Sequence, residues 1–586
     1  MEGFALFGWP PALGQGWSLH LAEPEQTLKA FRPDQVLPVL AQVEEAVSRG
    51  LWAAVAVSYE AAPAFDPVLR VHAPARLPLV WAALYRTPRP APAALPSGGY
   101  AAPSWEPGVE PSAHARAVSA IRDLIRSGDT YQVNYAIPFT CRFEGSDLAW
   151  FADLARAQRA GYASYLDLGS HAVLSLSPEL FFRIRGRKVT ARPMKGTAAR
   201  GRHPAEDEAR RAALETSAKD RSENVMIVDL LRSDLGRVAE AGSVQVRDLY
   251  RVEPYPTVWQ MTSTVEARLR PGAGLSGVLA ATFPCGSVTG APKVRTMEII
   301  RDLEPGPRQI YCGAVGYVAP GGDCEFSVPI RTVVLDREAG RAGFWVGGGV
   351  THDSTAAGEY AECLAKMRFL TAPAEDFRLL ETLLWERGGF PFLDGHLRRL
   401  AASSRYHGFP LDEEDVRRAL AAALAGRGSG RLRVRLLLAR DGAAEVQVSP
   451  LDRSPRPLRV GLAEKTVDSS QAWLFHKTDR RGFYDAALAG RPECDDVLLR
   501  NERGELTEAC TANLVLDMGG RLLTPALDCG LLPGVYRERL LARGIVAEAR
   551  LTLEDLLRAR RFWLVNALRR WRPARLVLDK ARAGRI

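Results

Sequence analysis

Lysine is the scarce residue of this chain. Its 77 basic residues comprise 68 arginines and nine lysines. Because arginine stays protonated, whereas a desolvated lysine can lose its proton near neutrality, a lysine retained in such a chain is a candidate for covalent or acid–base chemistry. Lys195, in the stretch "TARPMKGTAAR" (190–200), is the first such candidate. The alternative interpretation is an ordinary surface position.

Cysteine pairs, long apolar runs and basic clusters are also missing. The eight cysteines form no CxxC pair and no zinc-like spacing, which argues against a disulfide framework or a metal cluster and favours a reducing cytoplasm. No run of about eighteen uncharged apolar residues occurs, and the first residues lack the pattern of a secretion signal. The net charge of +9 comes from dispersed arginines, which favours an anionic substrate over nucleic acid. We therefore expect a cytoplasmic protein that binds neither membranes nor nucleic acid.

The length indicates more than one domain. A chain of 586 residues exceeds what one hydrophobic core normally supports. Residues 80–113 are dense in Pro, Ala and Gly and predict an irregular connection, and "TAPAEDF" (371–377) predicts the domain boundary. The expected parts are 1–113, 114–370, a linker at 371–377, and 378–586. We expect α+β architecture with mixed sheets in both halves.

Hydrophobic periodicity predicts the elements that carry the polar motifs. A helix is predicted from 114, and "ENVMIVDLLRSDLGRVAE" (223–240) predicts a helix that is apolar all round and therefore buried. Later elements are strands at 311–318, 325–336 and 342–350 and a helix at 356–370. After the boundary, "RLLETLLW" predicts a strand followed by a turn and a helix, and the alternation of "RLRVRLLLAR" predicts another strand.

Several polar residues and glycines of 114–370 lie within apolar stretches. They are Gln132, Glu179, Lys195, Glu223, Ser287, Thr289, Tyr311, Arg331, Gly347, Gly348, Gly349, Glu362 and Lys366. A buried carboxylate needs a partner, so Glu223 and Glu362 are expected to be paired, protonated or metal-bound. Two carboxylates without a dedicated cage suit Mg²⁺, which takes its other ligands from water and an anionic substrate. Salt bridges to nearby arginines are the alternative.

These segments together resemble one enzyme family. In chain order they read "YQVN", "SPELFF", "MKGT", "CGSVTGAPK", "YCGAVGY", "FSVPIRT", "VGGGV" and "EYAECLAKM". They resemble the chorismate-binding enzymes, the family of anthranilate synthase component I, isochorismate synthase and aminodeoxychorismate synthase component I. The resemblance implies a two-sheet α/β domain and Mg²⁺ held by Glu223 and Glu362. It also implies that chorismate contacts Tyr311, Arg331, Lys366, the Ser287 hydroxyl and the backbone of Gly347, Gly348 and Gly349.

Three positions distinguish the members of this family. "MKGT" resembles the aminodeoxychorismate synthases, whose lysine attacks C2 of chorismate, whereas anthranilate synthases have a small residue before "GT". Gln132 stands where isochorismate synthases keep a lysine base, and Gln260 where anthranilate synthases carry a histidine. Lys195 is therefore the expected nucleophile, and Glu179 the general acid that protonates the departing C4 hydroxyl.

Because no Gly-x-Cys-x-Gly elbow is found, a separate glutamine amidotransferase subunit is expected to supply ammonia.

A second group of residues centres on Lys477. It lies in "QAWLFHKTDRRGFYDAAL", where apolar residues precede it and basic residues follow, a setting that lowers the pKa of an amine. With "LTEACTANL" and "LLPGV", this stretch resembles the class IV pyridoxal-phosphate aminotransferase fold (D-amino-acid aminotransferase-like) and, within it, 4-amino-4-deoxychorismate lyases. The resemblance implies that Lys477 attaches the cofactor, Glu508 pairs with its pyridinium nitrogen and Arg399 contacts its phosphate. The expected remainder of the phosphate cradle is Thr511, Asn513, Gly534 and Val535.

The combined expectation is an enzyme with two activities that makes 4-aminobenzoate, a folate precursor, from chorismate and ammonia. One alternative is an anthranilate synthase-like half joined to a class IV amino-acid aminotransferase. The other is a C-terminal half without catalytic activity that serves as a scaffold.

Class IV domains commonly dimerise, so the resemblance allows a homodimer through this half. They also usually begin with an extra strand and loop before the segment matching "RLLETLLW", and the boundary at 371–377 leaves no room for these.

Overall fold

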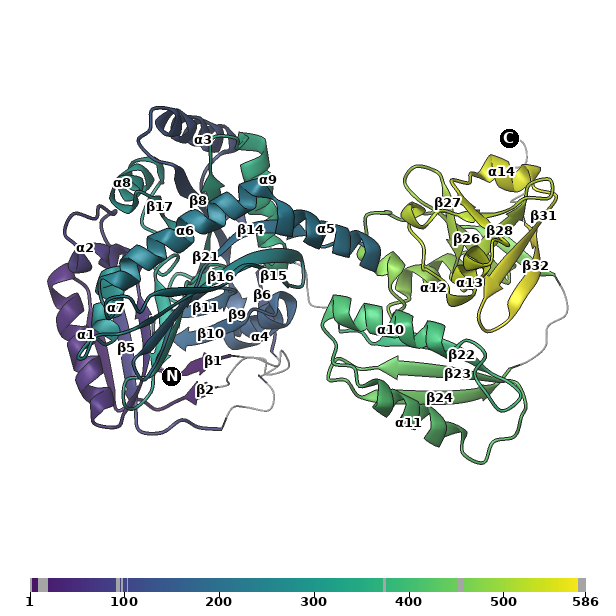
Figure 1. Cartoon of the computed structure of the whole chain (residues 1–586), viewed down its shortest axis with the longest axis horizontal. Helices are drawn as coiled ribbons and strands as arrows, with labels where there is room; N and C mark the ends of the chain where they lie inside the picture. The colour runs from purple at the N-terminus through teal and green to yellow at the C-terminus, as the bar shows by residue number, and fades with distance from the viewer. Residues whose placement is uncertain are drawn as a thin grey trace. The chain divides into compact units, whose positions relative to one another are not determined.

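The chain forms two compact units of mixed helices and strands (Figure 1). The computed structural model describes residues 3–8, 19–90, 95, 98–102, 104–371, 376–451 and 457–577. The N-terminal unit consists of Met1–Ala199 and Arg211–Glu375, and the C-terminal unit of Arg200–Arg210 and Asp376–Ile586. Of the predicted linker, residues 372–375 lie outside the described part. The mixed α and β composition expected from the sequence is confirmed in both units.

Two antiparallel sheets build the N-terminal unit. The first sheet has the spatial order β17 (Gly290–Ala291), β8 (Gln132–Arg142), β21 (Arg341–Val350), β20 (Thr332–Asp336), β11 (His171–Ser177), β10 (Tyr162–Asp167), β1 (Ala5–Phe7) and β2 (Leu19–Leu21), with β7 (Glu106–Pro107) beside β8. The second has the order β14 (Met194–Ala199), β16 (Val258–Arg268), β13 (Lys188–Arg192), β12 (Leu180–Arg185), β19 (Cys324–Ser327), β18 (Ala314–Val318), β4 (Trp52–Val57), β5 (Val80–Tyr85) and β3 (Gln26–Ala30), with β15 (Gln245–Pro254) beside β16. A cluster that contains Leu166 and Val173 of the first sheet and Trp81 and Val315 of the second packs the two sheets together.

Helices cover the outer faces of these sheets. On the first sheet pack α3 (Pro111–Arg126), α4 (Asp147–Gln158), α8 (Lys293–Leu303) and α9 (Ala356–Met367). On the second pack α1 (Pro33–Ser48), α2 (Ala62–Phe65), α6 (Ala218–Gly236) and α7 (Leu275–Thr282). The remaining elements are the pair β6 (Tyr100–Ala101) and β9 (Glu144–Gly145), and α5 (Pro204–Thr216). Side-chain hydrogen bonds cap the N-termini of several of these helices. At the N-terminus of α9, for example, the Thr355 side chain accepts a hydrogen bond from Gly358 N.

Two predictions about the second sheet and its helices are wrong. The stretch 80–113 does not begin as an irregular connection, because "VWAALY" forms the fully buried strand β5; a continuous apolar run is typical of a strand covered on both faces. Helix α6 is not buried all round. It buries one side through Ile227 and Leu231, while Asp229 and Arg232 are exposed, so the interspersed charges make it amphipathic.

The predicted strand at 325–336 is two strands that belong to different sheets. β19 lies in the second sheet and β20 in the first. Between them, Pro329 has no N–H to donate to a ladder, and Arg331 has a φ of 51°, which is incompatible with a strand. The chain therefore crosses from one sheet to the other at Val328–Arg331, and Arg331 lies at the end of this crossing.

The C-terminal unit contains two sheets. The smaller one consists of β22 (Leu379–Trp385), β23 (Leu432–Leu438) and β24 (Ala444–Pro450), and packs one face against α10 (Leu393–His407) and α11 (Glu413–Leu424). The larger one has the order β27 (Leu506–Ala509), β26 (Asp496–Arg500), β25 (Leu458–Leu462), β32 (Arg570–Leu576), β31 (Arg561–Asn566), β28 (Ala512–Asp517), β29 (Leu522–Pro525) and β30 (Ala547–Ala549). Its helices are α12 (Gly482–Ala489), α13 (Val535–Ala542) and α14 (Leu553–Arg558). The strand, turn and helix predicted from "RLLETLLW" are confirmed as β22 and α10, which ends at Gly408 in the left-handed region (φ 68°).

Candidate active sites

The first candidate site lies along the glycine segment of β21. Gly347, Gly348 and Gly349 pair in register with Ala136, Tyr135 and Asn134 of β8. A Cβ atom at Gly349 would lie 2.0 Å from Gln132 Nε2 and 3.0 Å from Lys195 Nζ, and one at Gly348 would lie 2.7 Å from Glu359 Oε2. The strand therefore lacks side chains where an amide, an amine and carboxylates approach its backbone.

Lys195 reaches this segment from β14. Burial lowers the pKa of its amine, and the positive charge of Lys366 acts in the same direction, against the carboxylates of Glu223 and Glu179. Asn224 donates a hydrogen bond of 3.3 Å to the Lys195 carbonyl, and Asn224 in turn accepts one of 2.5 Å from Ser263 Oγ. The backbone of β14 at Lys195 is thus held from α6 and β16.

Glu179 lies between β11 and β12 and is 1% exposed. Its Oε1 accepts a hydrogen bond of 2.6 Å from Ser287 Oγ. Burial raises the pKa of the carboxyl to about 7, although the Ser287 hydrogen bond and the charge of Lys195 oppose the rise. Glu179 therefore has the protonation behaviour of a general acid near neutrality. Ser287, which the resemblance assigns to the substrate, contacts Glu179 instead in this structure.

Carboxylates from two helices converge near the glycines. Glu223 comes from α6 and Glu362 from α9; burial raises the pKa of Glu223, and the charge of Glu362 contributes to this rise. Lys219 Nζ lies 3.8 Å from Glu223, and Lys366 Nζ lies 2.7 Å from Glu362 Oε1. The expectation that Glu362 is buried is wrong: its side chain is 52% exposed, because the buried residues of α9 are Cys363 and Met367.

Sequence reasoning missed a third carboxylate here. Glu359 precedes Glu362 by three residues on α9, a spacing that puts both on neighbouring positions of one helix face. Burial raises the pKa of Glu359, and Ser354 Oγ donates a 2.6 Å hydrogen bond to it. Carboxylate oxygens are the ligand type that Mg²⁺ prefers, together with water and substrate oxygens. No cluster of three or more His, Cys, Asp or Glu side chains with metal-binding geometry occurs among the residues described.

Groups suited to an anion also occur in this unit, and one of them, Lys366, lies on the same helix as Glu362. Burial lowers the pKa of Arg331 to about 10, and its left-handed backbone ends the crossing between the sheets. Lys366 Nζ donates a 2.7 Å hydrogen bond to Gly347 O. Tyr311 is 5% exposed and stacks on Trp345 at 6.4 Å between ring centroids. The resemblance assigned these three residues to chorismate. Lys366 and Tyr311 lie near the glycine segment or its neighbour Trp345, and Arg331 lies at the crossing between the sheets.

A buried ion pair that sequence reasoning missed supports Tyr311. Arg308 and Glu304 are joined at 2.6 Å, and both side chains are almost completely buried. The Arg308 guanidinium lies 5.7 Å from the Tyr311 ring centroid and donates to Val288 O at 3.0 Å and to Asn134 O at 2.6 Å. It thereby joins α8 to β8 and to the loop of Ser287. Glu304 caps the end of α8 and Arg308 lies in the loop beyond it, where charged residues are common, so the sequence carried no distinctive signal.

The two glutamines that distinguish family members have different surroundings. Both amide atoms of Gln132 are buried and have no hydrogen-bond partner among the described residues. Both amide atoms of Gln260 make hydrogen bonds: its Nε2 donates to Gly196 O at 2.8 Å, and its Oε1 accepts from Thr197 Oγ1 at 3.0 Å. Gln260 therefore positions the "MKGT" strand, while Gln132 is free to bind a ligand.

The second candidate site surrounds Lys477, which follows the 3₁₀ turn Ala472–Phe475. Leu380 N on β22 donates a 2.9 Å hydrogen bond to the Lys477 carbonyl, which fixes this backbone at the edge of the small sheet. Burial lowers the pKa of the Lys477 amine to about 8, helped by the charge of Arg399. The lowered pKa agrees with the direction predicted from the apolar and basic flanks of this lysine.

Glu508 on β27 is held by two side chains. Tyr484 Oη donates to its Oε1 at 3.0 Å and Asn513 Nδ2 to its Oε2 at 3.3 Å. Burial raises the pKa of Glu508 to about 7, and the charge of Lys477 opposes this rise. Lys477 and Glu508 thus influence each other inside one site. Tyr484 was not found from the sequence, because a tyrosine on a short helix is usually a packing residue.

Arg399 and the start of α13 form the other end of this site. Arg399 pairs with Glu381 at 2.6 Å and donates to Pro533 O at 3.0 Å, next to Gly534 and Val535 at the head of the helix. Helix N-termini and arginine suit a phosphate group. The two other predicted cradle residues are engaged elsewhere: Thr511 Oγ1 donates to Asp496 at 2.5 Å, and Asn513 donates to Glu508 and, at 2.9 Å, to Leu532 O.

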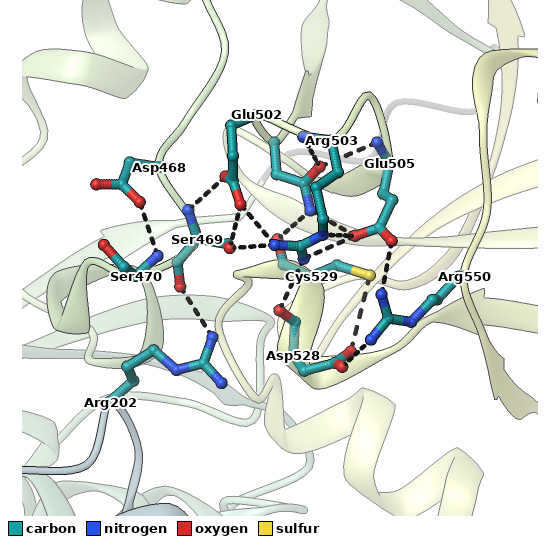
Figure 2. A network of polar contacts seen from close by, with 11 residues as sticks. Arg202, Asp468, Ser469, Ser470, Glu502, Arg503, Glu505, Asp528, Cys529 and Arg550 are labelled. Carbon is teal, nitrogen blue, oxygen red and sulfur yellow. Dashed lines mark hydrogen bonds and ion pairs between the residues drawn. The ribbon is translucent and has the colours of Figure 1, made fainter.

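A polar network anchors the loop that leads to Lys477 (Figure 2). Glu502 accepts hydrogen bonds from Ser469 N at 2.8 Å and Ser469 Oγ at 2.7 Å. Arg503 donates to Ser469 Oγ at 2.9 Å, and Arg202, from the segment Arg200–Arg210 of the same unit, donates to Ser469 O at 3.1 Å. Arg550 extends the network to Glu505 and Asp528. The loop is therefore fixed at Ser469, upstream of Lys477.

Two further observations concern the whole described chain. All eight cysteines are free thiols, and seven of them are buried. Among the described residues, every helix is too short or too polar to cross a bilayer.

Known protein families match both units. Residues 12–372 match the chorismate binding enzymes, and residues 378–577 match the class IV amino-transferases. The chain therefore belongs to the chorismate-binding enzymes, and it continues into a domain of the class IV aminotransferase fold. Both resemblances stated from the motifs are confirmed.

Individual members of the first family are similar to the N-terminal part of this chain. The chain is similar to aminodeoxychorismate synthase component 1 of Klebsiella aerogenes, with 44% identity over 264 residues that cover 45% of this chain and 58% of that protein. It is also similar to anthranilate synthase component 1 of Methanothermobacter thermautotrophicus, with 38% identity over 249 residues that cover 42% and 53% of the two chains. Among solved structures, anthranilate synthase component I from Streptococcus pneumoniae TIGR4 aligns with a TM-score of 0.54 and 25% identity, over 61% of this chain and 92% of that one. The chain spans less than two thirds of the length of the curated relatives that it matches best here.

Proposed function

We propose that this chain makes 4-aminobenzoate in two steps, one in each unit. The N-terminal unit converts chorismate and ammonia to 4-amino-4-deoxychorismate, and the C-terminal unit releases pyruvate from that intermediate. The observation that carries the proposal is a pair of partly buried lysines with lowered amine pKa values, each close to a carboxyl group whose pKa is raised to about 7. Similarity to aminodeoxychorismate synthase component 1 supports the first step.

In the first step, Glu179 and Lys195 act on opposite ends of one displacement. Glu179 in its protonated form donates its proton to the C4 hydroxyl, which leaves as water, while neutral Lys195 forms a bond to C2 as the double bond shifts. Ammonia then forms a bond to C4, the double bond shifts back and the bond between C2 and Lys195 breaks. An arginine at position 195 would stay charged and could not form this bond.

The substrate in this site would be held through its carboxylates. In this proposal Arg331, Tyr311 and Lys366 bind a substrate carboxylate, and Glu223 and Glu362 hold Mg²⁺, with Glu359 next to Glu362 on α9. When bound, Mg²⁺ supplies positive charge to a ring carboxylate and fixes its orientation. The unpartnered amide of Gln132 is left to contact the substrate or the incoming ammonia.

In the second step, Lys477 moves protons. Pyridoxal phosphate, when bound, supplies an electron sink for bonds next to the substrate amine. Lys477 would attach the cofactor and, once displaced by the substrate amine, take a proton from the ring as pyruvate leaves and the ring becomes aromatic. Glu508 would hold the pyridinium nitrogen, while Arg399 and the start of α13 would hold the phosphate.

The ammonia source is a partner protein in this proposal. The relative from Klebsiella aerogenes is named component 1, which implies a second component. We infer a glutamine amidotransferase subunit for that role, with free ammonium as its substitute in a test tube.

Product analysis of two lysine variants tests the proposal. The full-length protein is incubated with chorismate, Mg²⁺, ammonium and pyridoxal phosphate, and the amines are separated by chromatography. The wild type should release 4-aminobenzoate, Lys195→Ala should make no aminodeoxychorismate, and Lys477→Ala should accumulate it. Anthranilate as the product would refute the first step. Formation of 4-aminobenzoate by Lys477→Ala at the wild-type rate would refute the second.

A further inference from the structure

Two arginines on β23 share a face of the small C-terminal sheet whose nearby carboxylates, Glu386 and Glu445, are ion-paired with other arginines. Arg433 and Arg435 are two residues apart, so their side chains point to the same face of the strand. The intervening Val434 and the next residue Leu436 belong to the core under α10 and α11, which occupies the opposite face.

The cross-strand neighbours of both arginines are neutral. Arg435 pairs in register with Thr382 and Gln447, and Arg433 with Leu384 and Ser449. Directly opposed residues lie on the same face of a sheet, about 4.5–5.5 Å apart at Cβ. Further along this face Glu445 is already paired with Arg378 at 2.9 Å. The Nε atom of Arg435 is buried and has no hydrogen-bond partner among the described residues.

This face of the sheet adjoins the Lys477 backbone. Leu380 lies two residues before Thr382 on β22, and the Leu380 amide donates to the Lys477 carbonyl at 2.9 Å. β22 is the edge strand next to β23 (Figure 1). The two arginines therefore lie one strand inward from the backbone of the reactive lysine.

Arg481 joins the same cationic region from the other side of Lys477. Its Nη2 donates to Cys510 O at 2.8 Å, its guanidinium lies 5.0 Å from the Tyr484 ring centroid, and its Nε lies 3.7 Å from the exposed Asp485 carboxylate. Burial lowers the pKa of Arg433, and the positive charges of Arg435, Arg569 and Arg481 lower it further. The charge of Arg481 also lowers the pKa of Lys477. Like charges gathered in this way destabilise a fold unless a ligand of opposite charge occupies the space between them.

We propose that Arg433, Arg435 and Arg481 form a binding site for the carboxylates of a dicarboxylate substrate beside Lys477. This inference rests on the proposed function and extends it to the recognition of the intermediate, which carries one carboxylate on its ring and one on its enolpyruvyl group. Guanidinium groups bind carboxylates through two parallel hydrogen bonds, and three of them provide enough donors for both groups. Arg399 at the other end of the site stays with the cofactor phosphate.

The test compares arginine variants of the full-length protein by kinetics and by ligand binding. In Arg435→Gln and Arg433→Gln, the KM for aminodeoxychorismate should rise at least tenfold while kcat changes less, and Arg435→Lys should recover part of the loss. Arg418→Gln is the matched control, because Arg418 lies on α11, which covers the opposite face of the same sheet. An unchanged KM in both glutamine variants would overturn the proposal.

A binding measurement separates this site from the proposed reaction. Isophthalate, a planar dicarboxylate, should raise the unfolding temperature of the wild type and of Arg418→Gln more than benzoate does, and should have little effect on Arg435→Gln. The affinity for pyridoxal phosphate should be the same in all of these proteins. If the protein releases no pyruvate but isophthalate binding depends on Arg435, the proposed function fails and the site stands. If Arg435→Gln loses cofactor affinity and keeps isophthalate binding, the cluster serves the phosphate and the inference is wrong.

Discussion

Ser287 donates a 2.6 Å hydrogen bond to Glu179 in the interior of the N-terminal unit. The bond holds down the pKa of a carboxyl that burial raises to about 7. The alcohol therefore sets the pH range in which Glu179 can give up a proton, and the glycine segment, the amine and the acid form one site whose parts come from both sheets.

The pH dependence of chorismate consumption should change in Ser287→Ala. Glu179 donates a proton only while it is protonated, so the rate should fall as pH rises through about 7. Removing the Ser287 donor stabilises the protonated form, so this fall should move upward by up to about one pH unit, since a hydrogen bond to a charged group contributes roughly 1.5 kcal/mol. Ser175→Ala is the control, because Ser175 is equally buried but pairs with Thr332. A fall that moves downward in Ser287→Ala would contradict the assigned role.

Gly349→Ala should abolish the first reaction with little effect on folding. Its new methyl group would lie 2.0 Å from Gln132 Nε2 and 3.0 Å from Lys195 Nζ, so both side chains must move. We expect a loss of at least about a hundredfold in kcat/KM, the scale of a misplaced catalytic group. Gly343→Ala on the same strand is the control, because its nearest neighbour would be Val334 O at 3.8 Å. Equal activity of the two variants would exclude this account.

Lys195→Arg should be as inactive as Lys195→Ala in aminodeoxychorismate formation. Arginine keeps the charge and much of the length of lysine but cannot become a neutral amine, so the rate should fall by at least about a thousandfold. Mass spectrometry of the wild type trapped with chorismate in the absence of ammonium should show a covalent adduct at Lys195 and none in the variant. Lys188→Arg, whose side chain is exposed and paired with Glu266, serves as the control. Substantial turnover by Lys195→Arg would show that this residue is not the nucleophile.

Tyr484→Phe should weaken cofactor binding in the C-terminal unit. The tyrosine hydroxyl donates to Glu508 and favours its ionised form, so its removal should raise the pKa of Glu508 further above neutrality. A protonated Glu508 pairs poorly with a pyridinium nitrogen, and we expect about a threefold to tenfold loss of affinity for pyridoxal phosphate, from a hydrogen bond of about 1 kcal/mol. Absorbance titration with the cofactor measures it, and higher pH should restore affinity. Tyr100→Phe, which removes a hydroxyl bonded to Asp153 in the other unit, should change nothing.

The buried pair Arg308–Glu304 should dominate the stability of the N-terminal unit. Arg308→Met leaves Glu304 buried without its partner, a change that costs about 3–5 kcal/mol. Calorimetry of the full-length protein should show a lower unfolding temperature for one transition and an unchanged one for the C-terminal unit. Arg232→Met, which breaks the exposed pair with Asp229, should shift neither by more than about 1 kcal/mol. A second substitution, Glu304→Leu, should restore part of the loss.

The candidate residues of both sites were easier to select from the sequence than the residues that contact them. Lys195, Lys477 and Glu179 stand out because each is a rare or costly residue type within an apolar stretch. Glu359, Arg308 and Tyr484 do not, because charged residues and tyrosines are common on helices and in loops, and their burial depends on packing against segments far away in the chain. The exposure of Glu362 escaped prediction for the same reason, since the face of α9 that meets the sheet is set by tertiary contacts.

The division of 325–336 into β19 and β20 has a consequence for how this family can vary. The four residues Val328–Arg331 span the distance between two sheets and end in the left-handed backbone of Arg331. A substitution within them alters one side chain, whereas the insertion or deletion of a single residue would leave both sheets intact and turn the guanidinium out of the site. Positions 328–330 should therefore tolerate changes of residue type, while the length of the whole segment should be strictly constrained. A library of one-residue insertions should show this as a sharp local minimum in activity.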